Sequence, residues 1–342
     1  MLVAGPWTDP PSLARSGMHA GVDPSFWPTG LRTPADEARC AGYAAALAFY
    51  NGDQWRERPR RGESRLVLNY ARALIRKTAS YAFPAPVSFS VPPDADTPGQ
   101  TGLANETERL LMTTIATLDL PQLDVALAID AAVLGDAAIK ITWDVTRGRP
   151  CVAAVDPASL VAQWAPDNPR AVDAIVHTYG LTGDQVRRLF PELAGVEPEL
   201  TALAPAQVYP VVEHWTAARW RLTIAGQLVH DGDNPYGWIP YLVAASNPRP
   251  FSFWGQSDLL DLTDVCREIN RRMTVLSRIL ELSGAPIAVL ENVDGSDGIA
   301  VGPGAKWELP EGAKAYLLDL LQGEAPKFTS PTSSSSSAPS TT

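Results

Sequence analysis

The feature that most constrains the fold is an amphipathic stretch over residues 257–283, which predicts one long helix. At 1.5 Å per residue, about 27 helical residues make a rod of ~40 Å. The apolar side chains recur at a helical period and fall in one stripe about 100° wide. The stripe consists of Leu259, Leu262, Cys266, Ile269, Met273, Leu276 and Leu280. Few other helices are predicted after this rod, so the chain itself offers little to cover the stripe. The stripe therefore indicates that the helix packs against other subunits in an assembly.

The opposite face of the same stretch is basic. It carries Arg267, Arg271, Thr274 and Arg278, spaced by four, three and four residues. Asp264 lies three residues before Arg267, so a solvated face with local ion pairs is one interpretation. The other is a surface that turns its arginines toward a polyanion or an adjacent subunit. The residues leave both interpretations open.

Upstream of the rod, the sequence predicts an α+β fold with antiparallel strands. Thr33 before Pro34 is a typical helix start, and Gly52 is a typical helix end. Apolar and polar residues alternate most clearly over 219–224, which indicates a strand. Further helices are expected at 69–83, 103–119 and 121–134, with a short one after Thr182, and further strands at 87–91, 139–143, 151–155, 160–164, 172–179, 287–291, 306–309 and 314–319.

Composition divides the chain into five segments. Residues 1–30 are rich in Pro, Gly and Asp and are expected to form a mobile arm, followed by an α+β body over 31–255. Residues 256–284 hold the long helix, which begins with Ser257 as the expected N-cap, and 285–322 form a small β-rich segment. Residues 323–342 are rich in Ser, Thr and Pro, so they are expected to be disordered.

Charge argues against one class of function. The net charge is −10 and the pI is about 4.9, whereas a protein that grips nucleic acid needs a cation for each phosphate contact. A conduit past which DNA slides is compatible with this charge.

The sequence contains no run of about 18 apolar residues and no signal peptide, so no membrane association is expected. The three separated cysteines fit thiols in a reducing compartment.

The sequence offers little catalytic chemistry. It lacks the common phosphate-loop, zinc-protease and dinucleotide motifs, and its four histidines are isolated. Ser257 sits in a Gly-Gln-Ser-Asp context without the second glycine of a nucleophile elbow. Residues 231–233 begin like a calcium loop, but Leu242 stands where the last carboxylate belongs, so a hairpin turn is the better interpretation. We therefore expect no catalytic residue, no metal and no cofactor.

A set of short motifs resembles the portal (connector) proteins of long-tailed bacteriophages, in the gene-product-six-like branch. The motifs occur in order over roughly residues 43–320. They are YNGD at 50–53, NY at 69–70, YAFPAPV at 81–87, LGDA at 134–137, VDP at 155–157, NPYGWIP at 234–240, Asn247, and GQSDL at 255–259.

The resemblance implies a ring, usually of twelve subunits, at one vertex of the capsid. Double-stranded DNA would pass through the ring without sequence specificity while a terminase ATPase drives packaging. Residues 31–255 would form the wing, 256–284 a stem helix and 285–322 the clip that meets the terminase or head–tail adaptor proteins. Capsid and scaffold proteins are further implied partners. The protein would be a virion component at the capsid vertex, assembled in the host cytoplasm, and the basic face would point to the channel or to a neighbouring stem.

The chain departs from the family in one respect. Family members continue past the clip into a second stem helix, a channel loop and a crown, whereas this sequence passes into its Ser/Thr-rich tail. We expect a C-terminally truncated portal subunit. Two alternatives stay open: a head–tail adaptor or capsid-associated scaffold protein without a channel, and a hydrolase that uses Ser257 or an Asp cluster.

Overall fold

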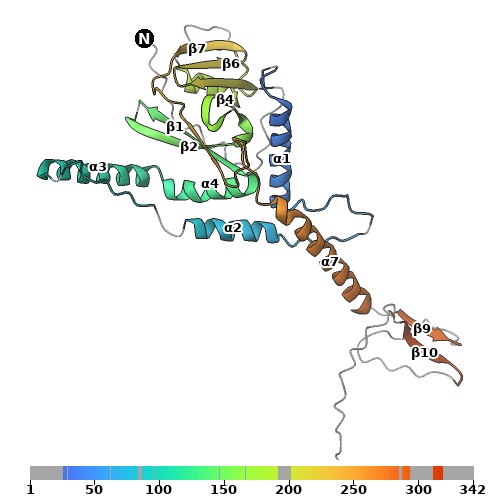
Figure 1. Ribbon diagram of the computed structural model, residues 1–342. Helices are drawn as coiled ribbons and strands as arrows, with labels where there is room; N and C mark the ends of the chain where they lie inside the picture. The colour runs from blue at the N-terminus through green and yellow to red at the C-terminus, as the bar shows by residue number, and fades with distance from the viewer. Residues whose placement is uncertain are drawn as a thin grey trace, which may run out of the picture. The chain divides into compact units, whose positions relative to one another are not determined.

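The structure is a computed structural model. It describes residues 26–28, 30–61, 63–83, 87–95, 97–145, 147–165, 167–191, 202–284, 287–292 and 311–318. The strand expected at 306–309, the tail at 323–342 and nearly all of the arm at 1–30 lie outside these residues. Helices and antiparallel sheets are both present, which confirms the predicted α+β fold (Figure 1).

The chain divides into two units. The first contains the described residues of 1–58 and 67–268, and the second contains those of 59–66 and 269–342. The long helix α7 (Leu260–Gly284) contributes turns to both. The second unit also contains β9 (Ile287–Glu291) and β10 (Lys314–Leu318), close to the strands predicted at 287–291 and 314–319. The two strands pair antiparallel.

Four helices of the first unit precede its sheets. They are α1 (Pro34–Asn51), α2 (Tyr70–Ala82), α3 (Pro98–Thr117) and α4 (Leu120–Leu134). The ends of α1 confirm the prediction: the Thr33 hydroxyl accepts a hydrogen bond from the Asp36 amide, and Gly52 ends the helix at φ 110°. Helix α3 begins five residues earlier than predicted, because Thr97 caps it and Pro98 occupies its first position.

Two antiparallel sheets follow. A three-stranded sheet has the order β2-β1-β8, and a five-stranded sheet has the order β3-β4-β5-β6-β7. The strands are β1 (Asp136–Asp144), β2 (Arg149–Val155), β3 (Leu160–Ala165), β4 (Asn168–Thr182), β5 (Val208–Thr216), β6 (Arg219–Ile224), β7 (Gln227–Asp233) and β8 (Tyr241–Ala245). The short helix α5 (Gly183–Leu189) follows β4 and is capped by Thr182, as predicted.

Two local predictions are wrong. Residues 87–91 form no strand, because they meet no partner strand; instead the Val91 amide donates a hydrogen bond to the Glu108 carboxylate on α3. Residues 231–233 are the end of β7 and not a turn. The turn lies before β7, at Ala225 and Gly226, which both have positive φ.

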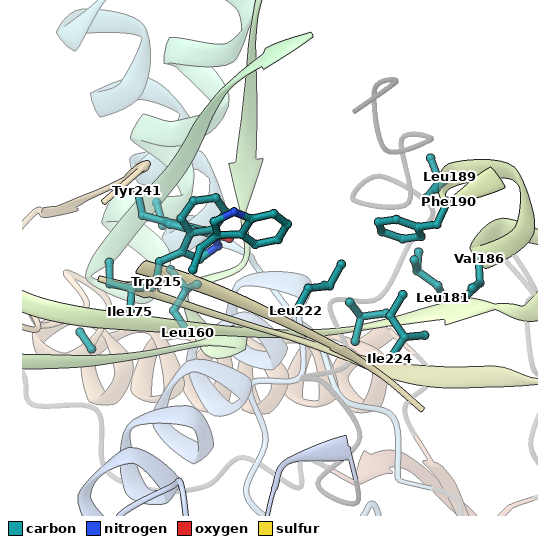
Figure 2. Packing of buried hydrophobic residues seen from close by; sticks show 14 of the residues in the cluster. Leu160, Ile175, Leu181, Val186, Leu189, Phe190, Trp215, Leu222, Ile224 and Tyr241 are labelled. Carbon is teal, nitrogen blue, oxygen red and sulfur yellow. The ribbon is translucent and has the colours of Figure 1, made fainter. Parts of the chain in front are cut away.

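Apolar side chains from both sheets form the larger core. Its fully buried members include Leu160, Ile175, Val211 and Leu222. Trp215 on β5 stacks on Trp220, with ring centroids 5.0 Å apart. Figure 2 shows Trp215 beside Tyr241 at one end of this core, and the side chains of α5 and Phe190 at the other. The core thus joins the two sheets into one body.

A buried ion pair also joins the sheets. Lys140 on β1 places its Nζ 2.8 Å and 2.6 Å from the two carboxylate oxygens of Glu213 on β5. The carboxylate also accepts hydrogen bonds from Tyr179, Trp215 and Tyr241, at 2.7, 2.7 and 3.1 Å. Burial alone would raise the pKa of Glu213, but the ammonium of Lys140 and its hydrogen bonds lower it to about 2. Glu213 is therefore ionised in the core.

Candidate functional site at the start of the long helix

The start of the long helix crosses the end of α4 at two glycines. Gly135, at φ 99°, has no room for a side chain, because a Cβ there would lie 2.5 Å from the carbonyl carbon of Gln256. A Cβ on Gly255 would lie 2.4 Å from the Gly135 oxygen. The Asp258 amide donates to the Ala132 carbonyl at 3.0 Å. The LGDA and GQSDL motifs, about 120 residues apart in sequence, therefore meet backbone to backbone.

Asp136 secures this crossing. Its carboxylate accepts hydrogen bonds from the Gly255 amide at 2.8 Å and from the Tyr43 hydroxyl on α1 at 2.5 Å. The residue is fully buried, and burial raises the pKa of its carboxyl group despite these hydrogen bonds. Burial likewise raises the pKa of Tyr43 above its usual range, so the tyrosine stays a donor. Asp136 thus ties α1, β1 and the segment before α7 together.

Ser257 has a structural role in the same place. Its hydroxyl donates to the Val133 carbonyl on α4 and accepts from the Leu259 amide at 3.1 Å. The helix itself begins at Leu260, so Ser257 caps the turn that leads into it and is not the residue directly before it. Because the hydroxyl is buried and bonded to backbone groups, this geometry gives no support to a nucleophilic Ser257.

Arg39 on α1 holds the segment before the crossing. Its guanidinium lies 3.8 Å from the ring centroid of Trp254. Two of its nitrogens donate to the carbonyls of Pro157 and Leu160, at 2.9 and 2.7 Å. The VDP motif at 155–157 is therefore placed next to the chain that enters α7.

A second contact holds the first turns of α7. The backbone carbonyl of Gln54 accepts a hydrogen bond from Arg267 at 3.2 Å. The side chain of Gln54 is buried and donates to the Phe49 carbonyl and to Asn69, while Asn69 donates to the Tyr50 carbonyl at 2.8 Å. The YNGD and NY motifs thus form one cluster with the long helix. No local pattern in the sequence marks Gln54, because the contact joins positions that are 213 residues apart.

The predicted apolar stripe has two environments. Leu259, 1% exposed, and Cys266, 4% exposed, are buried in a cluster with side chains of α1, α2 and α4, and Leu262 packs against it. Ile269 and Met273 are half-buried. Leu276 and Leu280 are 45% and 63% exposed. The first part of the stripe therefore fills the core of its own chain, and only the last part presents a large apolar surface.

The predicted basic face is also divided. Arg267 is held by the Gln54 carbonyl and by Asp264, at 3.2 and 3.4 Å. The Thr274 hydroxyl accepts a hydrogen bond from the Leu66 amide at 3.0 Å. Arg271 and Arg278 have exposed side chains. Arg267 and Thr274 thus contact other parts of their own chain. The side chains of Arg271 and Arg278 lie on the surface.

Within the described ranges, no three His, Cys, Asp or Glu side chains gather as metal ligands would. Nor is any single helix of this part of the chain long and apolar enough to cross a membrane. Helices α3 and α4 meet that test only when taken together across a 64° bend.

The geometry of the site is that of a mechanical anchor: it fixes the start of a long helix to a two-sheet body.

Residues 35–189, from α1 to α5, match the family model described as phage portal protein, SPP1 Gp6-like. This part of the chain is similar to the SPP1 Gp6-like phage portal proteins. The match bears out the resemblance over these residues and supports a phage portal role in general. It includes Asp136, Gly135 and Arg39, and it ends before the NPYGWIP and GQSDL motifs and before α7. No curated protein matches the chain.

Proposed function

We propose that the chain is the ring-forming portal subunit of a tailed bacteriophage. The ring, of about twelve copies, stands at one capsid vertex, conducts double-stranded DNA during packaging and ejection, and joins head to tail. Its partners are the terminase ATPase, head–tail adaptors, and capsid and scaffold proteins, and it assembles in the host cytoplasm. The family match over residues 35–189 carries this proposal.

The long helix supplies the mechanical part of the proposal. Its first turns are fixed to the body through Ser257, Gln54 and Arg267. Its last turns expose Leu276 and Leu280, an apolar surface that water disfavours and that neighbouring copies would cover in a ring. Residues 260–284 thus act as the stem, in which Leu276 and Leu280 pack between subunits and Arg271 and Arg278 contact an anionic partner.

Electron microscopy and native mass spectrometry of the purified chain test the proposal. We expect rings of about twelve copies with a central channel, and the same protein at one vertex of the virion. Leu276→Asp combined with Leu280→Asp should abolish the rings, because a subunit interface would then bury unpaired carboxylates. Ser277→Asp, on an exposed position of the same helix, is the matched control and should assemble.

A chain that stays monomeric at every concentration, or that assembles equally well with both leucines replaced, would contradict the proposed stem. Circular dichroism must show that the variants fold, and the exposure of both leucines predicts that they do.

A further inference from the structure

A short loop between β8 and α7 carries an exposed aromatic side chain. Residues 248–255 form this loop, and we call it the Phe251 loop. The side chain of Phe251 is 97% exposed, so it makes almost no contact with the described part of its own chain. Burying such a ring against another molecule would remove a large apolar area from water.

The backbone at Phe251 is strained. Its φ is 58°, in the left-handed region that costs free energy for a bulky side chain. The exposed ring gains no packing within its own chain that would offset this cost. Because strained residues cluster at functional contacts, the strain and the exposure together indicate that Phe251 binds another molecule.

The rest of the loop is firmly held. Pro248 and Gly255 form an antiparallel bridge that closes it. Phe253 stacks on Trp164 with ring centroids 5.5 Å apart, and Trp254 is 4% exposed. Because the loop is fixed before any partner binds, little conformational entropy is lost when Phe251 makes its contact.

A second aromatic surface lies near the far end of β1. Trp143 is 47% exposed, and its amide donates a hydrogen bond to the Tyr236 hydroxyl at 3.1 Å. Trp238 is 43% exposed, and its ring centroid lies 6.1 Å from that of Tyr236. We call Trp143, Tyr236 and Trp238 the aromatic patch. Two half-exposed tryptophans beside a tyrosine are a surface on which phenylalanine and proline pack favourably.

The Phe251 loop and the aromatic patch belong to one body but lie apart on it. Both are in the first unit. The Gly255 amide donates to Asp136, the first residue of β1, whereas Trp143 is the last residue but one of that strand. At 3.3 Å per residue, the strand from Asp136 to Trp143 spans about 23 Å. A contact between Phe251 and the patch therefore requires a second copy of the chain.

The charges beside the two surfaces are of opposite sign. Residues 246–257, which include the loop, contain Arg249 and no Asp or Glu. The patch residues Tyr236 and Trp238 follow Asp233, which is exposed. Arg219, the partner of Asp233 across the sheet, forms its ion pair with Asp231 at 2.9 Å. The exposed Arg249 of one copy thus finds a carboxylate beside the patch of another.

We propose that Phe251 of one copy packs on the aromatic patch of the next copy, head to tail around the ring. This inference rests on the proposed ring. The loop and the patch are different surfaces of one body, so each copy offers its loop to one neighbour and its patch to the other. Such a contact has a direction and closes into a ring when the rotation between copies allows it.

Substitutions in the full-length chain test the pairing. Phe251→Asn removes the ring and suits the left-handed backbone, so the melting temperature should not fall. The concentration needed for assembly should rise at least about 10-fold. Trp143→Thr with Trp238→Ser should weaken assembly by a similar factor. Leu228→Asn, on β7 and 53% exposed, is the matched control and should assemble like the wild type.

Photo-crosslinking tests the contact directly and does not depend on a destabilising change. A chain with p-benzoylphenylalanine in place of Phe251 is mixed with isotope-labelled wild type and irradiated, and the linked peptides are identified by mass spectrometry. We expect links from position 251 of one copy to residues 141–145 or 234–240 of another. Links only to other regions of a second copy would refute the pairing.

The outcomes separate this inference from the proposed function. If the wild type stays monomeric and gives no links between copies, both fail. If it forms rings and Phe251→Asn assembles at the same concentration, only the pairing fails. If position 251 links to the patch in oligomers that never close, the pairing holds and the ring function fails. If Phe251→Asn forms normal rings but the virions lack tails, the loop binds another virion protein and the pairing is refuted.

Discussion

Replacing Lys140 by Met should destabilise the body because it leaves a buried charge without its counterion. Glu213 is fully buried, and both of its oxygens lie within 2.8 Å of Lys140 Nζ. Removing one partner of such a pair costs about 3–5 kcal/mol. The remaining neutral donors, Tyr179, Trp215 and Tyr241, keep the expected loss toward the lower end of that range. A loss of this size is large against a total stability of about 5–15 kcal/mol.

The measurement is chemical unfolding at pH 7, followed by circular dichroism and tryptophan fluorescence. Combining Lys140→Met with Glu213→Gln removes both charges and should recover at least about 1.5 kcal/mol of the loss. Arg219→Met is the matched control for an exposed pair: Arg219 lies 2.9 Å from Asp231 on the surface, and its replacement should leave the free energy of unfolding nearly unchanged.

The pH dependence provides the sharper result. In the wild type, the pKa of Glu213 is lowered from 4.5 to about 2, so its contribution to stability is present above pH 4.5 and is lost as the pH falls toward 2. In the Lys140→Met variant, burial should raise this pKa, so the folded state favours the protonated acid. The deficit relative to the wild type should then shrink between pH 7 and pH 5. A loss below about 1 kcal/mol with an unchanged pH profile would refute the reasoning.

Further predictions concern the anchor of the long helix. Gly135→Ala should lower the free energy of unfolding by at least about 2 kcal/mol, since its Cβ would strike the backbone of Gln256. Gly226 has a similar φ but no atom near an added Cβ, so Gly226→Ala should lower the free energy of unfolding by only about 1 kcal/mol. Equal losses for the two variants in thermal unfolding would contradict a close backbone contact at Gly135. Gln54→Ala should cost about 1–3 kcal/mol and speed hydrogen exchange in the first turns of α7. Unchanged exchange there would argue against the contact.

The sequence predicts those parts of the fold whose causes are local. Helix α1 could be bounded from its Thr33 cap and its Gly52 end, and the long helix from its period, because each signal lies within a few residues of what it determines. The strand expected at 87–91 failed for the opposite reason. An alternating pattern indicates a strand only if another strand is available to pair with it, and the nearby acceptor is a side chain of α3.

The anchor could be predicted only as a set of separate motifs. Asp136, Gly255 and Tyr43 meet through the fold, and neither a period nor a spacing joins positions more than 90 residues apart. The buried pair between Lys140 and Glu213 escaped prediction in the same way. Lys140 alternates with apolar neighbours on β1, and such a lysine is normally assigned to the solvent side of a strand. Here the second sheet covers that side.

The long helix shows why a single apolar period does not reveal what covers it. Leu259 is 1% exposed and Leu280 63% exposed, although both belong to one stripe of one helix. The first turns are fixed by buried contacts from α1, α2 and α4, which exist only when the body is folded. The last turns present their leucines outward. We infer that folding of the body precedes assembly, because the buried contacts that hold the first turns of α7 form only in the folded body.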